Sequence, residues 1–302
     1  MRFRSRSTGM RGRARGPKLA VAAFMALAAV CSYYASRQKN PVTGETQAIA
    51  LTPNQEVALG LQSAPKVAQQ FGGLSDDPAL TAYVRGVGER IVSRSGARDT
   101  PYKFSFSLLK DEKTVNAFAL PGGPIFITRA LLNRLGNEAQ LAGVLGHEVG
   151  HVVGRHSAEK IAKSRLGQAL VGALGVATSD ERGRGSAMAQ MAGQMANQMV
   201  QLRYGRGDEL QSDALGVRFM SEAGYDPRAL INVMEILASV GGSKRQPEFM
   251  NSHPDPGNRS GEIRAEIAKR YPGGVPSDLT LGRTTNAGTR GEAGDAAGAS
   301  TR

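Results

Sequence analysis

Apolar and polar positions along residues 52–96 recur with a helical period. The segment Thr52–Gln70 opens with a threonine of the kind that caps helices, followed by a proline and, three residues after the cap, by a glutamine. These are the features of a capping box, so this segment should form a helix. An Asp-Pro pair repeats the start signal in Asp77–Gly96, which predicts a second helix.

The period then changes to the alternation that is typical of β-strands. Lys103–Leu109 (KFSFSLL) alternates in this way, and Val115–Leu120 and Pro124–Thr128 give two further short strands. Pro121-Gly122-Gly123, between the last two, is a strong turn signal. Together these segments predict a small, mostly antiparallel sheet.

Helical periodicity returns after residue 137 and continues through much of the remaining chain. Helices are expected over Glu138–Lys163, Gly207–Ala223, Asp226–Val240 and Arg259–Arg270. Gly224, between the second and third of these, is a candidate helix C-cap. The predicted fold class is therefore α+β, mostly helical, with one small sheet.

The N-terminal residues differ in character from the rest of the chain. A basic start is followed by the apolar run Leu19–Cys31 (LAVAAFMALAAVC), which is the layout of a secretory signal or an uncleaved signal anchor. A buried N-terminal helix is the alternative, which the Arg-rich start does not favour. Residues 1–35 are therefore predicted to be a signal peptide or signal anchor, and the polar residues 36–50 a linker.

The charge of the chain is unevenly distributed. The net charge is +12, but residues 1–44 contain nine of the 38 basic residues and no acidic one. The other 29 basic residues nearly balance the 26 acidic ones, so binding to nucleic acid is not expected. Residues 51–272 should form the folded domain. Residues 273–302, rich in Gly, Thr, Ala and Ser, should form a disordered tail.

Cys31 is the only cysteine, which excludes an internal disulfide and a cysteine-based metal site. It closes the apolar run, where a lipid-modified cysteine of a bacterial lipoprotein would lie. Val30 stands directly before it, where such a cleavage site requires a small residue. Cleavage, lipidation and retention as an anchor are alternatives that the sequence leaves open.

The pattern that carries chemistry is His147-Glu148-Val149-Gly150-His151, an HExxH motif. On a helix, positions i and i+4 share one face, so both imidazoles can reach one zinc ion. Glu148 lies between them and is placed to hold and deprotonate a water as general base. Two ordinary surface histidines are the alternative interpretation.

A catalytic zinc needs a third protein ligand. The longer pattern HExxHxxGxxH would place a histidine at position 157, which is Ser157. His156 is one residue short, and on a continuous helix it would point about 140° away from His151. Glu209 and Asp213, four residues apart in a predicted helix, are better candidates: Glu209 as ligand and Asp213 as acceptor of a hydrogen bond from a ligand histidine. A solvated acidic face is the alternative.

Two further segments have a catalytic interpretation. His253, on a loop with two prolines, could stabilise the oxyanion of a tetrahedral intermediate or bind zinc in a resting state, and the alternative is a solvated loop histidine. The strand that contains Asn116, Ala117 and Phe118 could pair with an extended substrate if it lies at the sheet edge beside the zinc. The alternative is a simple hairpin at the sheet edge.

These features together resemble the CaaX-prenyl-endopeptidase-like family of gluzincin metallopeptidases, in its bacterial envelope quality-control branch. The resemblance covers residues 45–271. It rests on VNAFALPGGPIFIT, LAGVLGHEVGHVVGRHSAE, RGDELQSD and SHPDPGNR, which occur in the order of the family. The chain departs from the family at Gly205, where serine is common, and at Gln211 and Ser212, where Glu and Ala are common.

The resemblance implies a gluzincin fold with zinc on His147, His151 and Glu209, and Glu148 as the catalytic base. It also implies a supporting role for Asp213 and a role for His253 at or near the metal. The expected function is hydrolysis of internal peptide bonds in misfolded or membrane-associated proteins of the bacterial envelope, on its periplasmic side. The alternative is a membrane-anchored, metal-binding chaperone or scaffold with little turnover.

Overall fold

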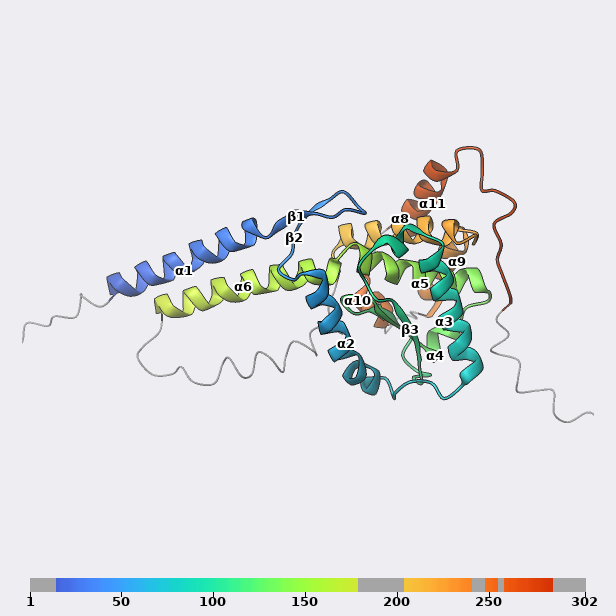
Figure 1. Cartoon of the computed structure of the whole chain (residues 1–302), viewed down its shortest axis with the longest axis horizontal. Coiled ribbons are helices and arrows are strands. Elements are labelled where there is room, and N and C mark those ends of the chain that lie inside the picture. The colour runs from blue at the N-terminus through green and yellow to red at the C-terminus, as the bar shows by residue number, and fades with distance from the viewer. Residues whose placement is uncertain (1–14, 179–203, 241–247, 255–257, 285–302) are drawn as a thin grey trace, which may run out of the picture.

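The chain is mostly helical, with two small sheets (Figure 1). The computed structural model describes residues 15–178, 204–240, 248–254 and 258–284. Its longer helices are α1 (Arg15–Ala35), α2 (Pro53–Gln70), α3 (Pro78–Ser93), α5 (Glu138–Val153), α6 (His156–Thr178), α8 (Arg206–Glu222), α9 (Ala229–Val240) and α11 (Arg259–Arg270). Short helices are η1 (Gly96–Asp99), α4 (Arg129–Leu132) and α10 (Glu248–Ser252). The predicted α+β, mostly helical class is confirmed.

The helix starts predicted from the sequence are also confirmed. The Thr52 side chain accepts a hydrogen bond from the Gln55 backbone N–H, and the Gln55 side chain accepts one from the Thr52 N–H. Asp77 caps α3 by accepting from the Leu80 N–H at 3.0 Å. Gly224, just beyond α8, has a φ of 85°, the left-handed conformation that glycine adopts most easily.

The main sheet has the order β3-β5-β4, formed by β3 (Ser105–Leu109), β5 (Pro124–Thr128) and β4 (Ala117–Ala119). The β4–β5 hairpin is antiparallel, as the turn between them predicts. β3 pairs with β5 in parallel, so the prediction of a mostly antiparallel sheet was wrong for this pair. The alternation of KFSFSLL identifies a strand but does not define its neighbour, and here β5 lies between β3 and β4.

Both faces of this sheet are buried, and alternate residues serve different cores. Ile125 and Ile127 of β5 face the main core, which includes α3 and α5, whereas Phe126 faces a smaller core with α2. In β4, Ala117 packs in the main core and Phe118 in the smaller one. This is the period of two that a strand imposes, and it fixes the sheet between α2 and α5.

α5 lies at the centre of the body, and every one of its side chains is buried. Glycines allow α8 to approach it closely. A Cβ on Gly150 would lie 2.9 Å from the Ser212 carbonyl oxygen, and one on Gly146 would lie 3.4 Å from the Gly216 oxygen. The Ser212 hydroxyl donates to the His147 carbonyl at 3.1 Å across this contact. The small residues therefore determine how near α8 can bring its own side chains.

The single helix predicted over Glu138–Lys163 is interrupted at Gly154 and Arg155. Arg155 has a φ of 59°, which a right-handed helix does not contain, so α5 ends at Val153 and α6 starts at His156. The Arg155 side chain is buried, where it pairs with Glu56 and donates to the Leu51 carbonyl at 2.8 Å. These contacts stabilise a backbone conformation that the helical pattern alone does not reveal.

Residues 36–50, interpreted as a linker, contain an antiparallel hairpin of β1 (Arg37–Lys39) and β2 (Thr46–Ala48). Asn40 donates to the Val153 carbonyl at 2.8 Å, and Gln47 donates to the Gly154 carbonyl at 2.7 Å. These carbonyls lie at the C-terminus of α5, where helix carbonyls lack helical partners. The hairpin therefore holds the α5–α6 junction.

The predicted disordered tail is ordered in its first part. The Thr280 carbonyl accepts from the Asp226 N–H at 3.0 Å, and the Arg283 carbonyl accepts from the Glu138 N–H at 2.9 Å. The backbone hydrogen bonds of residues 273–284 explain this order, because they secure the start of α5. Residues 285–302 of the predicted tail and residues 1–14 of the predicted leader lie outside the described chain.

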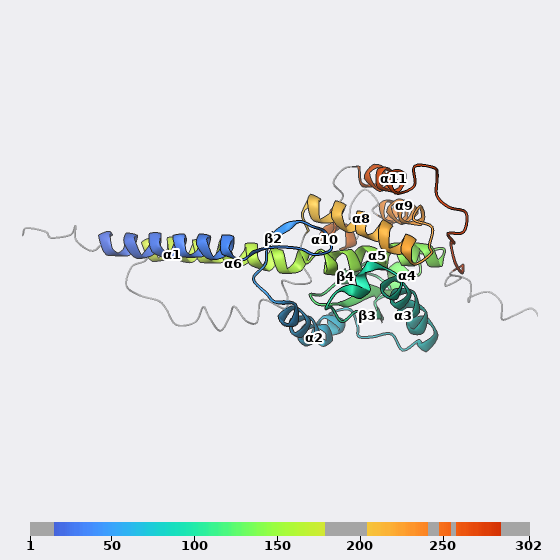
Figure 2. The same ribbon diagram turned by 45° about the horizontal axis from the view of Figure 1, so that its top comes forward.

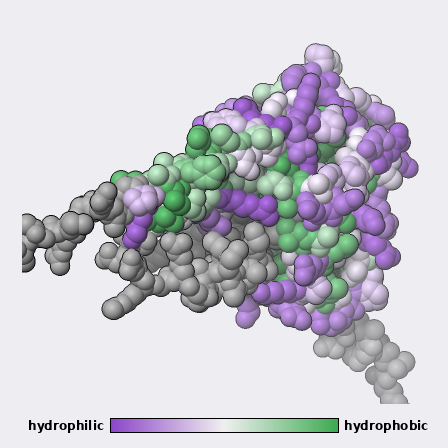
Figure 3. Space-filling view, turned by 60° about the vertical axis from the view of Figure 1, so that its left-hand side comes forward, coloured by the Kyte–Doolittle hydropathy of each residue, from purple (hydrophilic) through white to green (hydrophobic). Residues whose placement is uncertain are grey.

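α1 and α6 lie side by side and project from the body as an arm (Figures 1 and 2). Residues Pro17–Ala35 of α1 are long and apolar enough to cross a membrane. The arm differs from the body in surface character: in Figure 3 it is largely hydrophobic, whereas most of the outline of the body is hydrophilic.

Candidate metal centre

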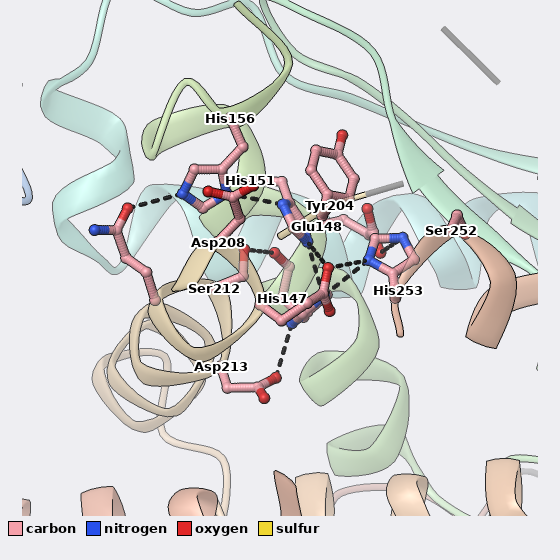
Figure 4. Close-up of polar contacts among 12 residues, drawn as sticks. His147, Glu148, His151, His156, Tyr204, Asp208, Ser212, Asp213, Ser252 and His253 are labelled. Atoms are coloured by element: carbon pink, nitrogen blue, oxygen red, sulfur yellow. Dashed lines mark hydrogen bonds and ion pairs between the residues drawn. The ribbon is translucent and has the colours of Figure 1, made fainter. Parts of the chain in front are cut away.

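Four side chains from three parts of the chain converge in the interior. His147 and His151 come from α5, and His253 directly follows α10 (Figure 4). Glu209 comes from α8. One ligand atom from each lies within 4.8 Å of the others, and all four residues are at most 1 % exposed. The solvated alternatives for the histidine pair, the acidic pair and His253 are therefore wrong.

The distances between these atoms suit a shared cation. The Nε2 atoms of His147 and His151 are 2.9 Å apart, and Nδ1 of His253 lies 3.3 Å from His147 Nε2 and 3.1 Å from Glu209 Oε1. Two nitrogens that share a tetrahedral zinc with bonds of about 2.05 Å lie roughly 3.3 Å apart. A small displacement of these rings would give that spacing.

Asp213 fixes the orientation of His147. Its Oδ1 lies 2.9 Å from His147 Nδ1, so the carboxylate accepts the Nδ1 proton and leaves Nε2 unprotonated toward the other three groups. This is the supporting position that the sequence predicted for Asp213. An aspartate that accepts from a ligand histidine both orients the ring and makes it a better ligand.

His156 has the same relation to His151, which the sequence did not predict. His156 Nε2 donates to Gln211 Oε1 at 2.8 Å, so His156 Nδ1 is free to accept. It lies 2.8 Å from His151 Nδ1 and accepts a hydrogen bond from the N–H there, which leaves His151 Nε2 unprotonated (Figure 4). The predicted angle of about 140° assumed a continuous helix. The turn at Arg155 brings His156 back beside His151.

Arg259, the first residue of α11, links two carboxylates of α8, those of Glu209 and Asp213. It donates to both Asp213 oxygens, from Nε at 2.7 Å and Nη2 at 2.8 Å, and its Nη1 lies 3.2 Å from Glu209 Oε2. Arg259 is 2 % exposed. A buried guanidinium that forms such a paired contact holds the carboxylates in fixed positions.

Glu148 is placed differently from every other carboxylate near the site. It is fully buried, and neither of its oxygens has a hydrogen-bond partner among the described residues. Its Oε1 lies 3.7 Å from His253 Nε2, which also lacks a partner in the described part of the chain. Buried polar atoms without partners are rare, and they are typical of sites that a water, ion or substrate completes.

Aromatic rings hold His151 and His253 in place. Tyr204 stacks on His151 with ring centroids 3.9 Å apart, and its hydroxyl lies 2.9 Å from the Ser157 hydroxyl. Phe249 stacks on His253 at 4.5 Å, and its carbonyl accepts from the His253 backbone N–H at 2.7 Å. His253 is thus fixed by the end of α10.

Ionisation in the site reflects burial and opposite charges. Burial raises the pKa of Glu148, which the neighbouring histidines only partly oppose. Burial also lowers the pKa of His151, with a further decrease from His147 and His253. For Asp213, burial would raise the pKa, but the charge of Arg259 lowers it to about 2. The site therefore retains a neutral histidine and an ionised supporting aspartate.

These residues fit a bound divalent cation. Three carboxylates (Glu148, Glu209 and Asp213) lie around one buried permanent cation, Arg259, so the buried carboxylates outnumber the guanidinium that could neutralise them. Charges are costly to bury unless they are neutralised. Imidazole nitrogens with one carboxylate oxygen are the ligand set of catalytic zinc sites. The chemistry of the donors and the unpartnered Glu148 thus agree.

Comparison with known proteins gives the same result. Residues 78–267 match the family described as Peptidase family M48. The chain belongs to this family. The resemblance to gluzincin metallopeptidases that the sequence indicated is confirmed.

The M48 relatives include proteins from bacteria and from mitochondria. The chain is 31 % identical over 239 residues to the beta-barrel assembly-enhancing protease of Escherichia coli strain K12, which covers 77 % of this chain and 48 % of that relative. It is 35 % identical over 184 residues to the mitochondrial metalloendopeptidase OMA1 of Schizosaccharomyces pombe, covering 61 % and 52 %. For the metalloprotease YcaL of Escherichia coli the values are 28 % over 169 residues, covering 56 % and 63 %. The chain thus spans about half the length of the curated relatives it matches first.

The strand predicted to bind substrate, β4, lies at an edge of the main sheet and packs on α5. The Asn116 carbonyl accepts from the Thr128 N–H, and the Leu120 N–H donates to the Pro124 carbonyl. Hydrogen-bonded residues alternate in an antiparallel pair. Phe118 therefore bonds to β5, whereas the N–H and C=O groups of Ala117 and Ala119 face away from it.

Three residues that organise the site were missed as site residues: His156, Tyr204 and Arg259. Arg259 stands in the SHPDPGNR motif, so the motif contained a signal for it. His156 is visible in the sequence but requires the turn at Arg155 to reach the site. Tyr204 acts through a ring stack between distant segments, for which the spacing of residues gives no signal.

Proposed function

We propose that this M48 member is a zinc-dependent metalloendopeptidase in which His147, His151 and Glu209 hold the ion and Glu148 is the general base. One observation carries the proposal: the ligand atoms of the three residues converge beside a buried carboxylate whose two oxygens have no hydrogen-bond partner in the described part of the chain. A purely structural zinc site has no use for such a carboxylate, because all of its ligand positions are occupied.

When bound, zinc lowers the pKa of a water and polarises the scissile carbonyl. Glu148 accepts the proton of the attacking water on a carboxylate oxygen and then delivers it to the leaving amine nitrogen. Asp213 and His156 keep the Nδ1 protons of His147 and His151 directed away from the ion. His253 presents Nε2 toward Glu148 at 3.7 Å, which suits a donor to the developing oxyanion.

The substrate in this proposal is an extended polypeptide that pairs with β4. The outward N–H and C=O groups of Ala117 and Ala119 provide the backbone hydrogen bonds of an added strand. Asn116 supports this assignment because its buried Oδ1 has no hydrogen-bond partner among the described residues. Phe118 serves indirectly, through its packing with Phe71 and Phe126, which holds the strand in place.

The proposed substrates are misfolded or membrane-associated proteins of the bacterial envelope, met on the periplasmic side of a membrane. Two observations support this choice: an α1 of membrane-spanning length and composition, and relatives that include a beta-barrel assembly-enhancing protease. Binding of an unfolded chain through its backbone also fits a protease that acts on many sequences.

The test compares wild type with Glu148→Gln in the full chain, purified in detergent. We expect both proteins to bind about one zinc per chain. Casein cleavage should fall by at least about a hundredfold in the variant. Glu89→Gln is the matched control, because it makes the same change at an exposed helical site and should leave cleavage unchanged. Equal cleavage by Glu148→Gln, or loss of zinc from it, would remove Glu148 as the base.

A second candidate is a metal-binding scaffold, which one observation favours. His253 belongs to the converging set, so all four positions of a tetrahedral ion can be filled by protein. His253→Ala separates the two functions. A peptidase with His253 at rest on the metal retains zinc and some cleavage in this variant, whereas a scaffold loses metal and gains no activity.

A further inference from the structure

The arm formed by α1 and α6 has two distinct faces. Along α1 the most buried positions are small, and the same holds for the outer half of α6: Ala22 is 7 % exposed and Ala173 is 3 % exposed. Small residues at the contact allow helices to approach closely, as they do in membrane-embedded pairs. The alanine face is thus covered by the partner helix.

The outward face of the arm is strongly apolar and exposed. Phe24 is 72 % exposed on α1, and Val171 and Leu174 are 71 % and 64 % exposed on α6. Of the twelve exposed large hydrophobic side chains in the described part of the chain, nine belong to the arm. A patch of this kind marks a site that contacts a membrane or another apolar surface.

The charges on α6 are confined to the end that joins the body. Lys160, Lys163 and Arg165 lie in that part, whereas the helix carries no charged residue from Leu166 to Thr178. The uncharged part is about 20 Å long, since each helical residue advances about 1.5 Å. That length reaches roughly two thirds of the way through a hydrocarbon core of about 30 Å.

The same level of the arm is marked by polar groups of α1. A cavity of about 470 Å³, where the arm leaves the body, is lined by Ser32, Tyr33, Ser36 and Arg165 together with apolar side chains. Arg37 and Lys39 follow immediately in the chain. Hydroxyl, tyrosine and basic side chains are typical of the headgroup layer, where cations attract anionic lipids.

We propose that the arm is inserted in a lipid bilayer as a unit, with the outer half of α6 as a second membrane-embedded helix beside α1. α1 alone passes a test of length and hydropathy that a signal sequence also passes. The pairing adds a reason for its retention, because removal of α1 would uncover the alanine face of α6. The bilayer is the occupant that the charge pattern of α6 favours over a second protein copy, since the basic residues of this helix end where its apolar face begins.

Insertion of α6 fixes the distance of the metal centre from the membrane. α6 begins at His156, which contacts His151, and its last charged residue is Arg165. The ten residues between these points span about 15 Å of helix. Arg155, Asn40 and Gln47 hold the α5–α6 junction, so the direction of α6 is set by the body. This consequence rests on the proposed peptidase, which would then cleave chains near the bilayer surface.

The test measures depth in full-length protein that carries Glu148→Gln to prevent turnover and Cys31→Ser to remove the natural thiol. Leu166→Cys, Leu170→Cys and Leu174→Cys each introduce one site on α6 for an environment-sensitive fluorophore. Leu74→Cys is the matched control, because this leucine is 53 % exposed on the body. The proteins are reconstituted in vesicles of phosphatidylethanolamine and phosphatidylglycerol.

If α6 is inserted, lipid-attached nitroxides should quench the labels at positions 170 and 174 at least about twofold more strongly than the label at position 74. Iodide, which stays in water, should quench the label at position 74 more strongly than the labels at positions 170 and 174. The depth should increase from position 166 to position 174. Equal access of iodide to positions 174 and 74 overturns the proposal. Protection from both quenchers overturns it in favour of a protein partner, and equal depth at all three positions overturns it in favour of a helix on the membrane surface. None of these outcomes depends on casein cleavage, so this proposal and the proposed function can fail separately.

Discussion

α5 and α6 are consecutive helices, but α5 is buried in the protein whereas the outer half of α6 is exposed. α5 buries every side chain, including two histidines and two glutamates, whereas the outer half of α6 exposes leucine and valine. Each is unfavourable in water alone: buried charges need partners, and large apolar patches need a cover. A metal ion resolves the first case and a bilayer the second, so each helix indicates what else the protein binds.

The change from the buried helix α5 to the projecting helix α6 takes place within two residues. Gly154 and Arg155 end the buried helix, and Arg155 remains buried beside Glu56 while the chain leaves the body. His156, the first residue of α6, still contacts His151 of the site, with their Nδ1 atoms 2.8 Å apart. The site and the arm are therefore parts of one continuous structure.

The largest expected effect tests whether the balance of buried charges stabilises the site on α5 and α8. Arg259→Met leaves Asp213 and Glu209 without their cation, and removal of one partner from a buried ion pair costs about 3–5 kcal/mol. We expect a corresponding loss of stability in thermal unfolding of the metal-free protein in detergent. Added zinc should restore part of it, because the ion supplies positive charge.

Arg264→Met is the matched control for this experiment. Arg264 lies on the same helix, but its side chain is 59 % exposed and its pair with Glu235 is 3.9 Å long. Exposed pairs contribute about 0–1 kcal/mol. Similar losses for the two variants would mean that the Arg259 network does not stabilise the site.

How much of the fold and the site could be predicted from the sequence depends on how far apart along the chain the interacting residues lie. The capping residues Thr52 and Asp77 and the HExxH spacing act within one or two turns, and the structure agrees with them. The contacts of His156, Tyr204 and Arg259 with the site join segments 5 to 53 residues apart through a turn, a ring stack and an ion pair. None of these has a repeating spacing that could reveal it.

The errors in the fold have the same origin. The parallel pairing of β3 is decided by where β5 packs, and the order in residues 36–50 and 273–284 by hydrogen bonds to α5. Polar segments of this kind are typical of linkers by composition alone. Asn40 and Gln47 are ordered because they donate hydrogen bonds to the carbonyls at the end of α5, which have no partners within the helix.

The next effect tests the close approach of α5 and α8. Gly150→Ala would place a Cβ 2.9 Å from the Ser212 carbonyl oxygen, so α8 has to move and Glu209 moves with it. Overpacking of this kind costs about 1–3 kcal/mol. Zinc affinity should fall together with the melting temperature, because the third ligand is displaced.

Gly86→Ala is the control for backbone effects. Gly86 lies in α3 with no atom within 4 Å of an added Cβ, so alanine should leave stability unchanged or raise it by up to about 1 kcal/mol. If Gly150→Ala behaved like Gly86→Ala, the glycine contact would not determine the position of α8.

A smaller effect tests the relay that serves His151. His156→Ala removes the acceptor for the His151 Nδ1 proton, and loss of such a partner lowers metal affinity about 10- to 100-fold. Competition with a zinc chelator measures this change at constant pH. His156→Asn retains an acceptor oxygen and should recover part of the affinity. If alanine and asparagine gave the same affinity, His156 would act by packing and not by orienting His151.

The smallest expected effect lies at the exposed end of the comparison, on the arm. Leu174→Ala removes apolar surface that, in the proposed arrangement, contacts acyl chains in the folded protein, so no protein cavity forms. The free energy of unfolding, followed through the melting temperature in detergent, should then change by no more than about 0.5 kcal/mol. Leu145→Ala makes the same substitution at a fully buried position of α5 and should cost about 2–5 kcal/mol. A large loss for Leu174→Ala would mean that protein covers this face of α6, and the arm would then belong to an interface between chains instead of a bilayer.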